Sequence, residues 1–288
     1  MNAMPKTLAT EDAITNGAGQ RIYFRAWRPT SAPKAIVVIC PGLLAHSGLY
    51  AWPAERLANL GYCVYAVDLR GRGLSEGERY FVETIDEYVD DVGTVIAMAK
   101  NRDTGLPTYL LGHSAGGVVA CVYALTHPAM LNGLICESFA FEVPAPDAAL
   151  ALITLASRFF PRAPVLKLKA EDFSRDPVIV ERLKGDALID DEVQPAATVA
   201  ALARANQRLK TSFPQISTPV LILHGSADKV TRPRGSQRFF DTTGSTDKTL
   251  KIYEGHVHDL LADFDKERVL ADIGQWIEAR RQGLAREA

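Results

Sequence analysis

The sequence predicts an α/β protein built on a mostly parallel sheet with helices on both faces. Apolar runs without polar alternation predict strands that are buried on both sides, at 35–40, 62–67, 108–111, 133–136, 220–223 and 250–253. Helical patterns fall between these runs, at about 51–60, 86–100, 117–127, 233–240 and 265–281. Such alternation of strands and helices is typical of a doubly wound fold.

Two segments depart from this alternation. The sequence Asn-Gly-Ala-Gly at 16–19, followed by an alternating run at 21–27, predicts an N-terminal β-hairpin. From 139 to 214 no buried strand is predicted, and helical patterns occur near 147–160 and 196–210. We expect this insertion to form a helical cap over the carboxyl edge of the sheet, where α/β proteins bind ligands. The expected division is an α/β core, 1–138 and 215–288, and a cap, 139–214.

Composition is that of an ordinary globular enzyme. The 288 residues are 47% hydrophobic and 23% charged, and the formal net charge is −2. No excess of basic residues favours nucleic acid as a partner. Cys40, Cys63, Cys121 and Cys136 lie in separate apolar runs, which predicts small buried side chains rather than disulfides or metal ligands. Without a signal-peptide pattern or an apolar run of membrane-spanning length, we expect a cytoplasmic protein.

The most informative motif is Gly-x-Ser-x-Gly at 112–116, between an apolar strand pattern and an apolar helical pattern. A nucleophilic serine must be exposed on a sharp strand-to-helix turn, where a histidine can take its proton. Glycines on either side remove side chains that would collide in such a turn. Ser114 is therefore the predicted nucleophile. The alternative is a glycine-rich turn in which Ser114 caps the helix.

A serine nucleophile needs a histidine base and a carboxylate that orients the histidine. Asp228 follows the strand pattern at 220–223 and is the predicted acid, although it could instead cap the next helix. His256 and His258 both follow the last strand pattern and are the candidate bases. No cysteine or spaced histidine cluster supports reading this region as a zinc site. The oxyanion hole is expected from the backbone N–H groups of Ala115 and Leu43.

These motifs together resemble the monoacylglycerol lipase-like, or serine aminopeptidase-like, branch of the α/β-hydrolases. The resemblance covers nearly the whole chain, through the segments Pro41–Tyr50, Asp68–Ser75, Gly112–Gly117, Gly225–Asp228 and Tyr253–Asp259. The last segment aligns with the family pattern Tyr-x-Gly-x-x-His-Glu/Asp, and this alignment selects His258 as the base.

Two residues depart from the family motifs. Pro41 stands in place of the first histidine of the oxyanion loop, and Arg72 replaces the middle histidine of the Asp-x-x-Gly-His-Gly-x-Ser segment. Neither position supplies a triad group. We expect His46 and Ser47 to brace the oxyanion loop by hydrogen bonds, and His113 to pack behind the elbow.

The predicted function is a cofactor-free serine carboxylester hydrolase that acts on a small-molecule ester. The resemblance implies an apolar acyl group, bound by Leu152, Leu155 and Phe159 in the apolar stretch 148–160, with peripheral lipid contact through the cap. The same stretch could instead pack on the core or on a partner subunit, so the oligomeric state stays open. An amidase or peptidase with the same triad, and a non-catalytic ligand-binding protein of this fold, are the alternatives.

Overall fold

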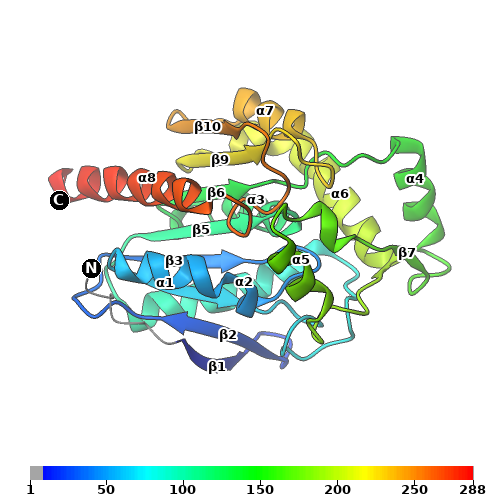
Figure 1. Ribbon diagram of the computed structural model, residues 1–288, viewed down its shortest axis with the longest axis horizontal. Coiled ribbons are helices and arrows are strands. Elements are labelled where there is room, and N and C mark those ends of the chain that lie inside the picture. Colours follow the sequence, from blue (N-terminus) through cyan, green and yellow to red (C-terminus); the bar gives the residue numbers. More distant parts are fainter. Residues whose placement is uncertain (1–8, 288) are drawn as a thin grey trace.

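The computed structural model describes residues 9–287 and contains one eight-stranded sheet (Figure 1). Its strand order is β1-β2-β4-β3-β5-β6-β9-β10. The bounds are β1 Thr10–Thr15, β2 Arg21–Trp27, β3 Ala35–Cys40, β4 Tyr62–Val67, β5 Thr108–His113, β6 Gly133–Glu137, β9 Val220–Gly225 and β10 Lys248–Tyr253. The strands from β4 to β10 pair in parallel, whereas β1 and β2 are antiparallel to their neighbours. The predicted mostly parallel sheet and the N-terminal hairpin are confirmed.

Helices cover both faces of this sheet. α1 (Ala51–Asn59) and α8 (Lys266–Glu287) share one apolar cluster with the strands, whereas α2 (Ile85–Arg102), α3 (Ala115–Thr126) and α7 (Pro233–Thr242) contribute to another. Successive side chains of β3 alternate between the two clusters, since neighbouring residues of a strand point to opposite faces. Both faces are apolar, which explains why the strand sequences lack polar alternation.

Three parallel strands extend further toward their carboxyl ends than the sequence pattern predicts. β5 continues to His113, β6 to Glu137 and β9 to Gly225, and neighbouring strands end in register, with His113 opposite Glu137 and Gly225 opposite Tyr253. A polar residue ends the apolar run in the sequence, but the backbone hydrogen bonds between neighbouring strands continue past it. The loops that follow these strands therefore leave the sheet along one edge.

Residues 139–214 form α4 (Asp147–Ala156), α5 (Pro177–Lys184), α6 (Ala196–Ser212) and a small antiparallel pair, β7 (Pro164–Leu166) and β8 (Gln194–Pro195). Short 3₁₀ helices lie at Ser47–Tyr50, Pro128–Met130, Ala170–Asp172 and Phe213–Gln215. Figure 1 shows α4 and β7 together at one end of the molecule, at the right of the view. The exact boundary between core and cap stays a prediction.

The predicted helix at 147–160 is too long. α4 ends at Ala156, and residues 157–159 form a turn. The Ser157 hydroxyl donates to the Thr154 carbonyl oxygen (2.9 Å), which competes with continued helix, and Pro161 disfavours helical backbone at the residue before it.

Candidate active site

Ser114 lies at the junction of β5 and α3 with a backbone that side chains seldom adopt. Its φ is 55° and its ψ is −119°. Close packing surrounds the turn: a Cβ atom at Gly116 would collide with the carbonyl oxygen of Cys40, and one at Gly112 would collide with that of Gly116. The glycines of the motif are therefore required by space, and the serine occupies a strained position of the kind found at functional sites.

This strain predicts an unusual order of stabilities. Ser114→Gly should be about 1 kcal/mol more stable than Ser114→Ala, because glycine adopts positive φ without the penalty that a Cβ atom carries. Urea unfolding of the two variants measures the difference. Ala120→Gly, inside α3, is the matched control and should destabilise the protein. Equal stability of the two Ser114 variants would contradict the strain assignment.

Asp228 and His258, predicted from separate loops, lie in direct contact. The Asp228 Oδ2 atom is 2.8 Å from the His258 Nδ1 atom, and both side chains are fully buried. Asp228 follows β9 and His258 follows β10, so the adjacent parallel strands bring them together. His256, the other candidate base, has its Nδ1 atom 3.3 Å from the Glu254 carbonyl oxygen and makes no hydrogen bond to Asp228.

Asp228 is held by more partners than the sequence indicated. The backbone N–H groups of Val230 and Thr231 donate to its Oδ1 atom, at 2.7 and 2.9 Å. The Thr231 hydroxyl donates to Oδ2 (2.7 Å), and His224 Nε2 lies 3.1 Å from the same oxygen. Burial acts to raise the pKa of Asp228, but hydrogen bonds from His224 and His258 outweigh it and hold the pKa well below its usual range. The carboxylate is ionised at neutral pH.

His258 lies between two rings and keeps one nitrogen free of protein partners. Its ring centroid is 5.0 Å from that of His113 and 4.9 Å from that of Phe173. With Nδ1 occupied by Asp228, the buried Nε2 atom has no partner among the described residues. His113 immediately precedes Ser114, so the free nitrogen belongs to a ring packed beside the elbow. A neutral imidazole in this tautomer presents a lone pair at Nε2.

The loop after β3 lies against the elbow. A Cβ atom at Gly42 would be 2.9 Å from the Ser114 Cβ atom and 3.5 Å from the Ala115 nitrogen. The two predicted oxyanion donors, Leu43 and Ala115, are both buried beside this contact. Further along the loop, Gly48 N donates to His46 Nδ1 (3.1 Å) and Ser47 N donates to Asp68 Oδ1 (2.6 Å), so hydrogen bonds of the kind we expect for His46 and Ser47 are present.

With this geometry the chain can be compared with known proteins. A family model described as serine aminopeptidase, S33, matches residues 31–265. The chain belongs to this family.

Relatives within the S33 family are named as lipases. The monoacylglycerol lipase of Mycolicibacterium smegmatis is 31% identical over 278 residues, which cover 95% of this chain and 99% of the relative. Human monoglyceride lipase is 31% identical over 284 residues, covering 96% and 93%. The crystal structure of Paleococcus ferrophilus monoacylglycerol lipase superposes with a TM-score of 0.81 at 29% identity, covering 90% and 99%. The protein is a monoacylglycerol lipase-like α/β-hydrolase, and hence a carboxylic ester hydrolase.

In this S33 hydrolase a second group of ionisable side chains, buried or partly buried, lies next to His258. His113, Glu137 and Asp259 bring one ligand atom each within 4.8 Å of one another, and they are the group of described residues whose spacing could hold a metal ion. Burial raises the pKa of Glu137 well above its ordinary value and that of Asp259 to about 6, and it lowers the pKa of His113. Burial thus disfavours the charged form of each of these three side chains.

The raised pKa of Glu137 predicts a pH-dependent stability. In the unfolded chain Glu137 ionises above about pH 4.3, whereas the folded protein keeps it protonated to higher pH, so its contribution to stability falls as pH rises. Glu137→Gln should therefore gain stability relative to the native protein as pH rises from 4 to 8. Thermal unfolding at several pH values measures this difference. The exposed Glu254→Gln is the control, and a difference that does not vary with pH would refute the shift.

Of the residues predicted to bind the acyl group, Leu152 and Leu155 lie on α4, which has no buried residue, and Phe159 lies in the turn that follows it. Leu155 lines a groove of about 710 Å³ between α4 and α6, together with Phe141, Leu150 and several arginines, whereas Leu152 and Phe159 are not among its lining residues. None of Ser114, Asp228 and His258 lines this groove, so the acyl role of the three apolar residues stays a prediction. No helix among residues 9–287 combines the length and apolar character needed to cross a membrane.

Proposed function

We propose that the protein hydrolyses esters with apolar acyl groups, monoacylglycerols among them, through Ser114, His258 and Asp228. The observation that carries this proposal is the contact between Asp228 and the Nδ1 atom of His258. It leaves Nε2 free on a ring that packs against His113, the residue before the strained Ser114. A buried acid, an oriented imidazole and a serine on a sharp turn are the groups that acyl transfer requires.

In the first half of the proposed reaction, Ser114 Oγ attacks the ester carbonyl carbon while His258 Nε2 accepts the hydroxyl proton. Asp228 stabilises the resulting imidazolium through Nδ1. The N–H groups of Leu43 and Ala115 donate to the oxyanion. His258 then gives the proton to the departing alcohol, which leaves an acyl-enzyme at Ser114.

The second half repeats these roles with water. His258 Nε2 takes a proton from a water molecule, whose oxygen attacks the acyl carbonyl, and it returns that proton to Ser114 Oγ as the acid leaves. Because Asp228 stays ionised at neutral pH, it can stabilise the imidazolium in both halves.

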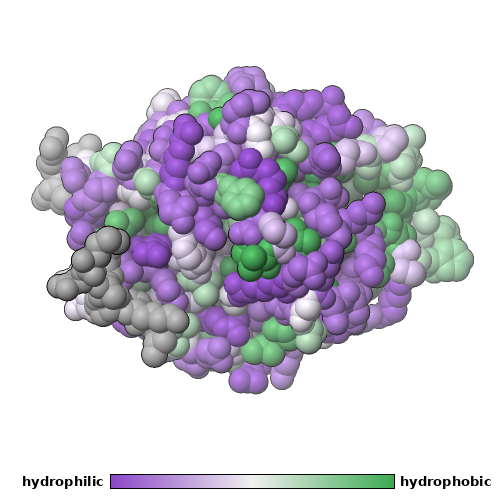
Figure 2. Space-filling model, viewed as in Figure 1, coloured by the Kyte–Doolittle hydropathy of each residue, from purple (hydrophilic) through white to green (hydrophobic). Residues whose placement is uncertain are grey.

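We further propose that residues 139–214 act as a cap that meets apolar substrate at its outer surface. Figure 2 shows apolar side chains gathered at the end of the molecule where Figure 1 places α4. Between residues 152 and 160, four large apolar side chains are more than half exposed: Leu152, Leu155, Phe159 and Phe160. An exposed cluster of this kind is typical of a surface that contacts lipid or another protein.

Hydrolysis of p-nitrophenyl esters from acetate to palmitate, and of monoacylglycerols, tests the proposed function. The Ser114→Ala variant is the blank, and a matched p-nitroanilide measures amide cleavage. Ester turnover that depends on Ser114 supports the proposal, and the preferred chain length sizes the acyl site. Anilide cleavage faster than ester cleavage would favour the amidase alternative. Ligand retention without turnover would favour a binding protein.

A further inference from the structure

Arg72 is one of the two departures from the family motifs. Only 2% of the residue is exposed, and each of its three guanidinium nitrogens has a hydrogen-bond partner. Its Nη1 atom donates to Glu192 Oε1 (2.6 Å), Nη2 donates to Gln194 Oε1 (2.8 Å) and Nε donates to the Tyr88 hydroxyl (3.0 Å). Arg72 lies in the loop after β4, whereas Glu192 and Gln194 belong to the inserted segment. The guanidinium therefore joins the core to the insertion.

Glu192 also reaches the loop that follows β3. Its Oε1 atom, already bound to Arg72, accepts a hydrogen bond from the backbone N–H of Leu44 (2.7 Å). Leu44 has a φ of 55°, a conformation that a leucine adopts only when its surroundings hold it there. One carboxylate oxygen thus fixes a strained peptide 148 positions earlier in the chain.

The position of that peptide matters because Leu44 follows Leu43, the proposed oxyanion donor. The nitrogen of Leu44 lies in the same peptide plane as the carbonyl of Leu43, so fixing it limits rotation about the Leu43 backbone. Gly42, on the other side, already packs against Ser114 and Ala115. Leu43 is therefore held from both sides, by the elbow through Gly42 and by Glu192 through Leu44.

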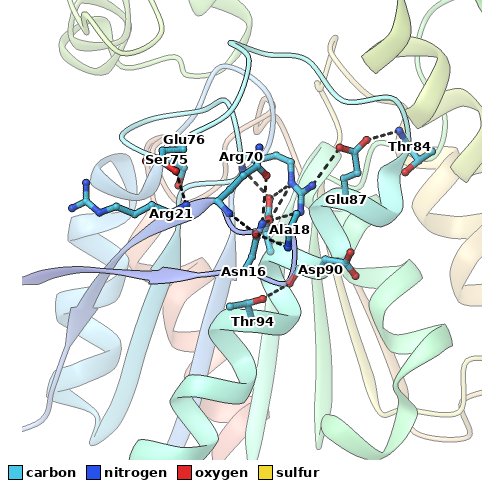
Figure 3. Close-up of polar contacts among 12 residues, drawn as sticks. Asn16, Ala18, Arg21, Arg70, Ser75, Glu76, Thr84, Glu87, Asp90 and Thr94 are labelled. Atoms are coloured by element: carbon cyan, nitrogen blue, oxygen red, sulfur yellow. Dashed lines mark hydrogen bonds and ion pairs between the residues drawn. The ribbon is translucent and has the colours of Figure 1, made fainter.

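The loop that presents Arg72 is itself anchored. Arg70 donates to Asp91 (2.7 Å) and to Glu87 of α2, and Figure 3 shows Arg70 among the polar contacts that join this loop to Asn16 and to the start of α2. Asp68 accepts from the N–H groups of Ser47 (2.6 Å) and Leu74 (2.8 Å). Rigid attachment at both ends of the loop lets Arg72 hold Glu192 in one place.

We propose that Glu192 is a positioning residue for the oxyanion hole, held by Arg72 and acting through the Leu44 N–H. This inference rests on the proposed function of Leu43 and Ala115. In this proposal Arg72 holds the Glu192 carboxylate in place. The geometry of the oxyanion hole therefore depends on the inserted segment, to which Glu192 belongs. Since a donor misplaced by about 1 Å can cost on the order of 100-fold in rate, the effect should be large and confined to kcat.

A purely structural ion pair is the alternative, and a pair of double variants separates the two. Removing one partner alone would leave an unpaired buried charge and could unfold the protein. Arg72→Met with Glu192→Gln removes both charges but keeps an amide oxygen that can accept from Leu44 N. Arg72→Met with Glu192→Leu removes the charges and the acceptor. The two proteins differ only at position 192, where leucine removes the acceptor for Leu44 N and also the acceptor for the Gln194 amide.

Steady-state hydrolysis of p-nitrophenyl butyrate gives kcat and KM for both. We expect kcat of the Leu double variant to be about 10–100-fold below that of the Gln double variant, with KM within about twofold. The control is Asp191→Asn, which removes a neighbouring negative charge but keeps an amide oxygen that can accept from the Tyr80 hydroxyl (2.6 Å in the native protein), and it should keep native kcat. Equal kcat values for the two double variants, or an effect confined to KM, would overturn the proposal.

Amide hydrogen exchange supplies a readout that does not need turnover. Exchange at Leu44 should be faster in the Leu double variant than in the Gln double variant, and unchanged in Asp191→Asn. Loss of the proposed function would appear as absence of Ser114-dependent hydrolysis in the native protein. Failure of the positioning role would appear as equal exchange at Leu44 in the two double variants.

Discussion

Ser114→Ala is expected to lower kcat for ester hydrolysis by roughly 10⁴–10⁶-fold while the protein stays folded. The alanine keeps the Cβ atom and the strained backbone of the elbow but removes the oxygen that would form the acyl-enzyme. His258 and Asp228 should keep their contact, since neither side chain is hydrogen-bonded to Ser114 in the structure. Burst kinetics with a p-nitrophenyl ester measure both steps, and the burst should disappear with the hydroxyl.

The control for this experiment is the thermal stability of the variant, which shows whether it is folded. Thermal unfolding of Ser114→Ala should resemble that of the native protein, because the substitution leaves the packing around Gly42 and Gly116 intact. Residual turnover above a hundredth of the native rate in a folded, pure sample would contradict the nucleophile assignment. Such a result would favour direct attack by a water molecule that His258 activates, without a covalent intermediate.

Asp228→Asn is expected to lower kcat by about 10³–10⁴-fold. The asparagine amide can donate to Nδ1 of His258, which would place the ring proton on Nε2 and remove the lone pair that accepts the serine proton. The negative charge that stabilises the imidazolium is lost as well. Because His224 and Thr231 also bond to Asp228, part of the local network should persist and keep the side chain in place.

A matched substitution separates the loss of this charge from the loss of any buried carboxylate. Asp103 is buried and binds Arg28 (2.6 Å) and the Tyr65 hydroxyl (2.7 Å), away from Ser114 and His258, so Asp103→Asn should lower stability and keep kcat. Near-native kcat in folded Asp228→Asn would transfer the role of acid to another carboxyl, and Glu137 at the end of β6 is the buried candidate to examine next.

Much of the fold follows from the sequence because its signals are local. Apolar runs without polar alternation locate the buried strands within two residues at most ends, and the glycines around Ser114 report the space that the elbow requires. Strand lengths are less local: β5, β6 and β9 continue through polar residues because pairing with neighbours, not side-chain polarity, decides where a ladder ends. α4 is shorter than predicted for a similar reason, since Ser157 and Pro161 end a helix that apolar periodicity alone would extend.

The sequence by itself determined the fold class, the elbow serine, and two loops from which an acid and a base had to come. Only the tertiary structure brings Asp228 against His258 with His224 and Thr231 around the carboxylate. Only the tertiary structure joins Glu192 to Leu44, because no periodicity or motif links positions 148 residues apart. The local sequence pattern indicates which face of a segment is buried. The partners of a buried charged side chain depend instead on which distant segments pack together in the folded sheet and insertion.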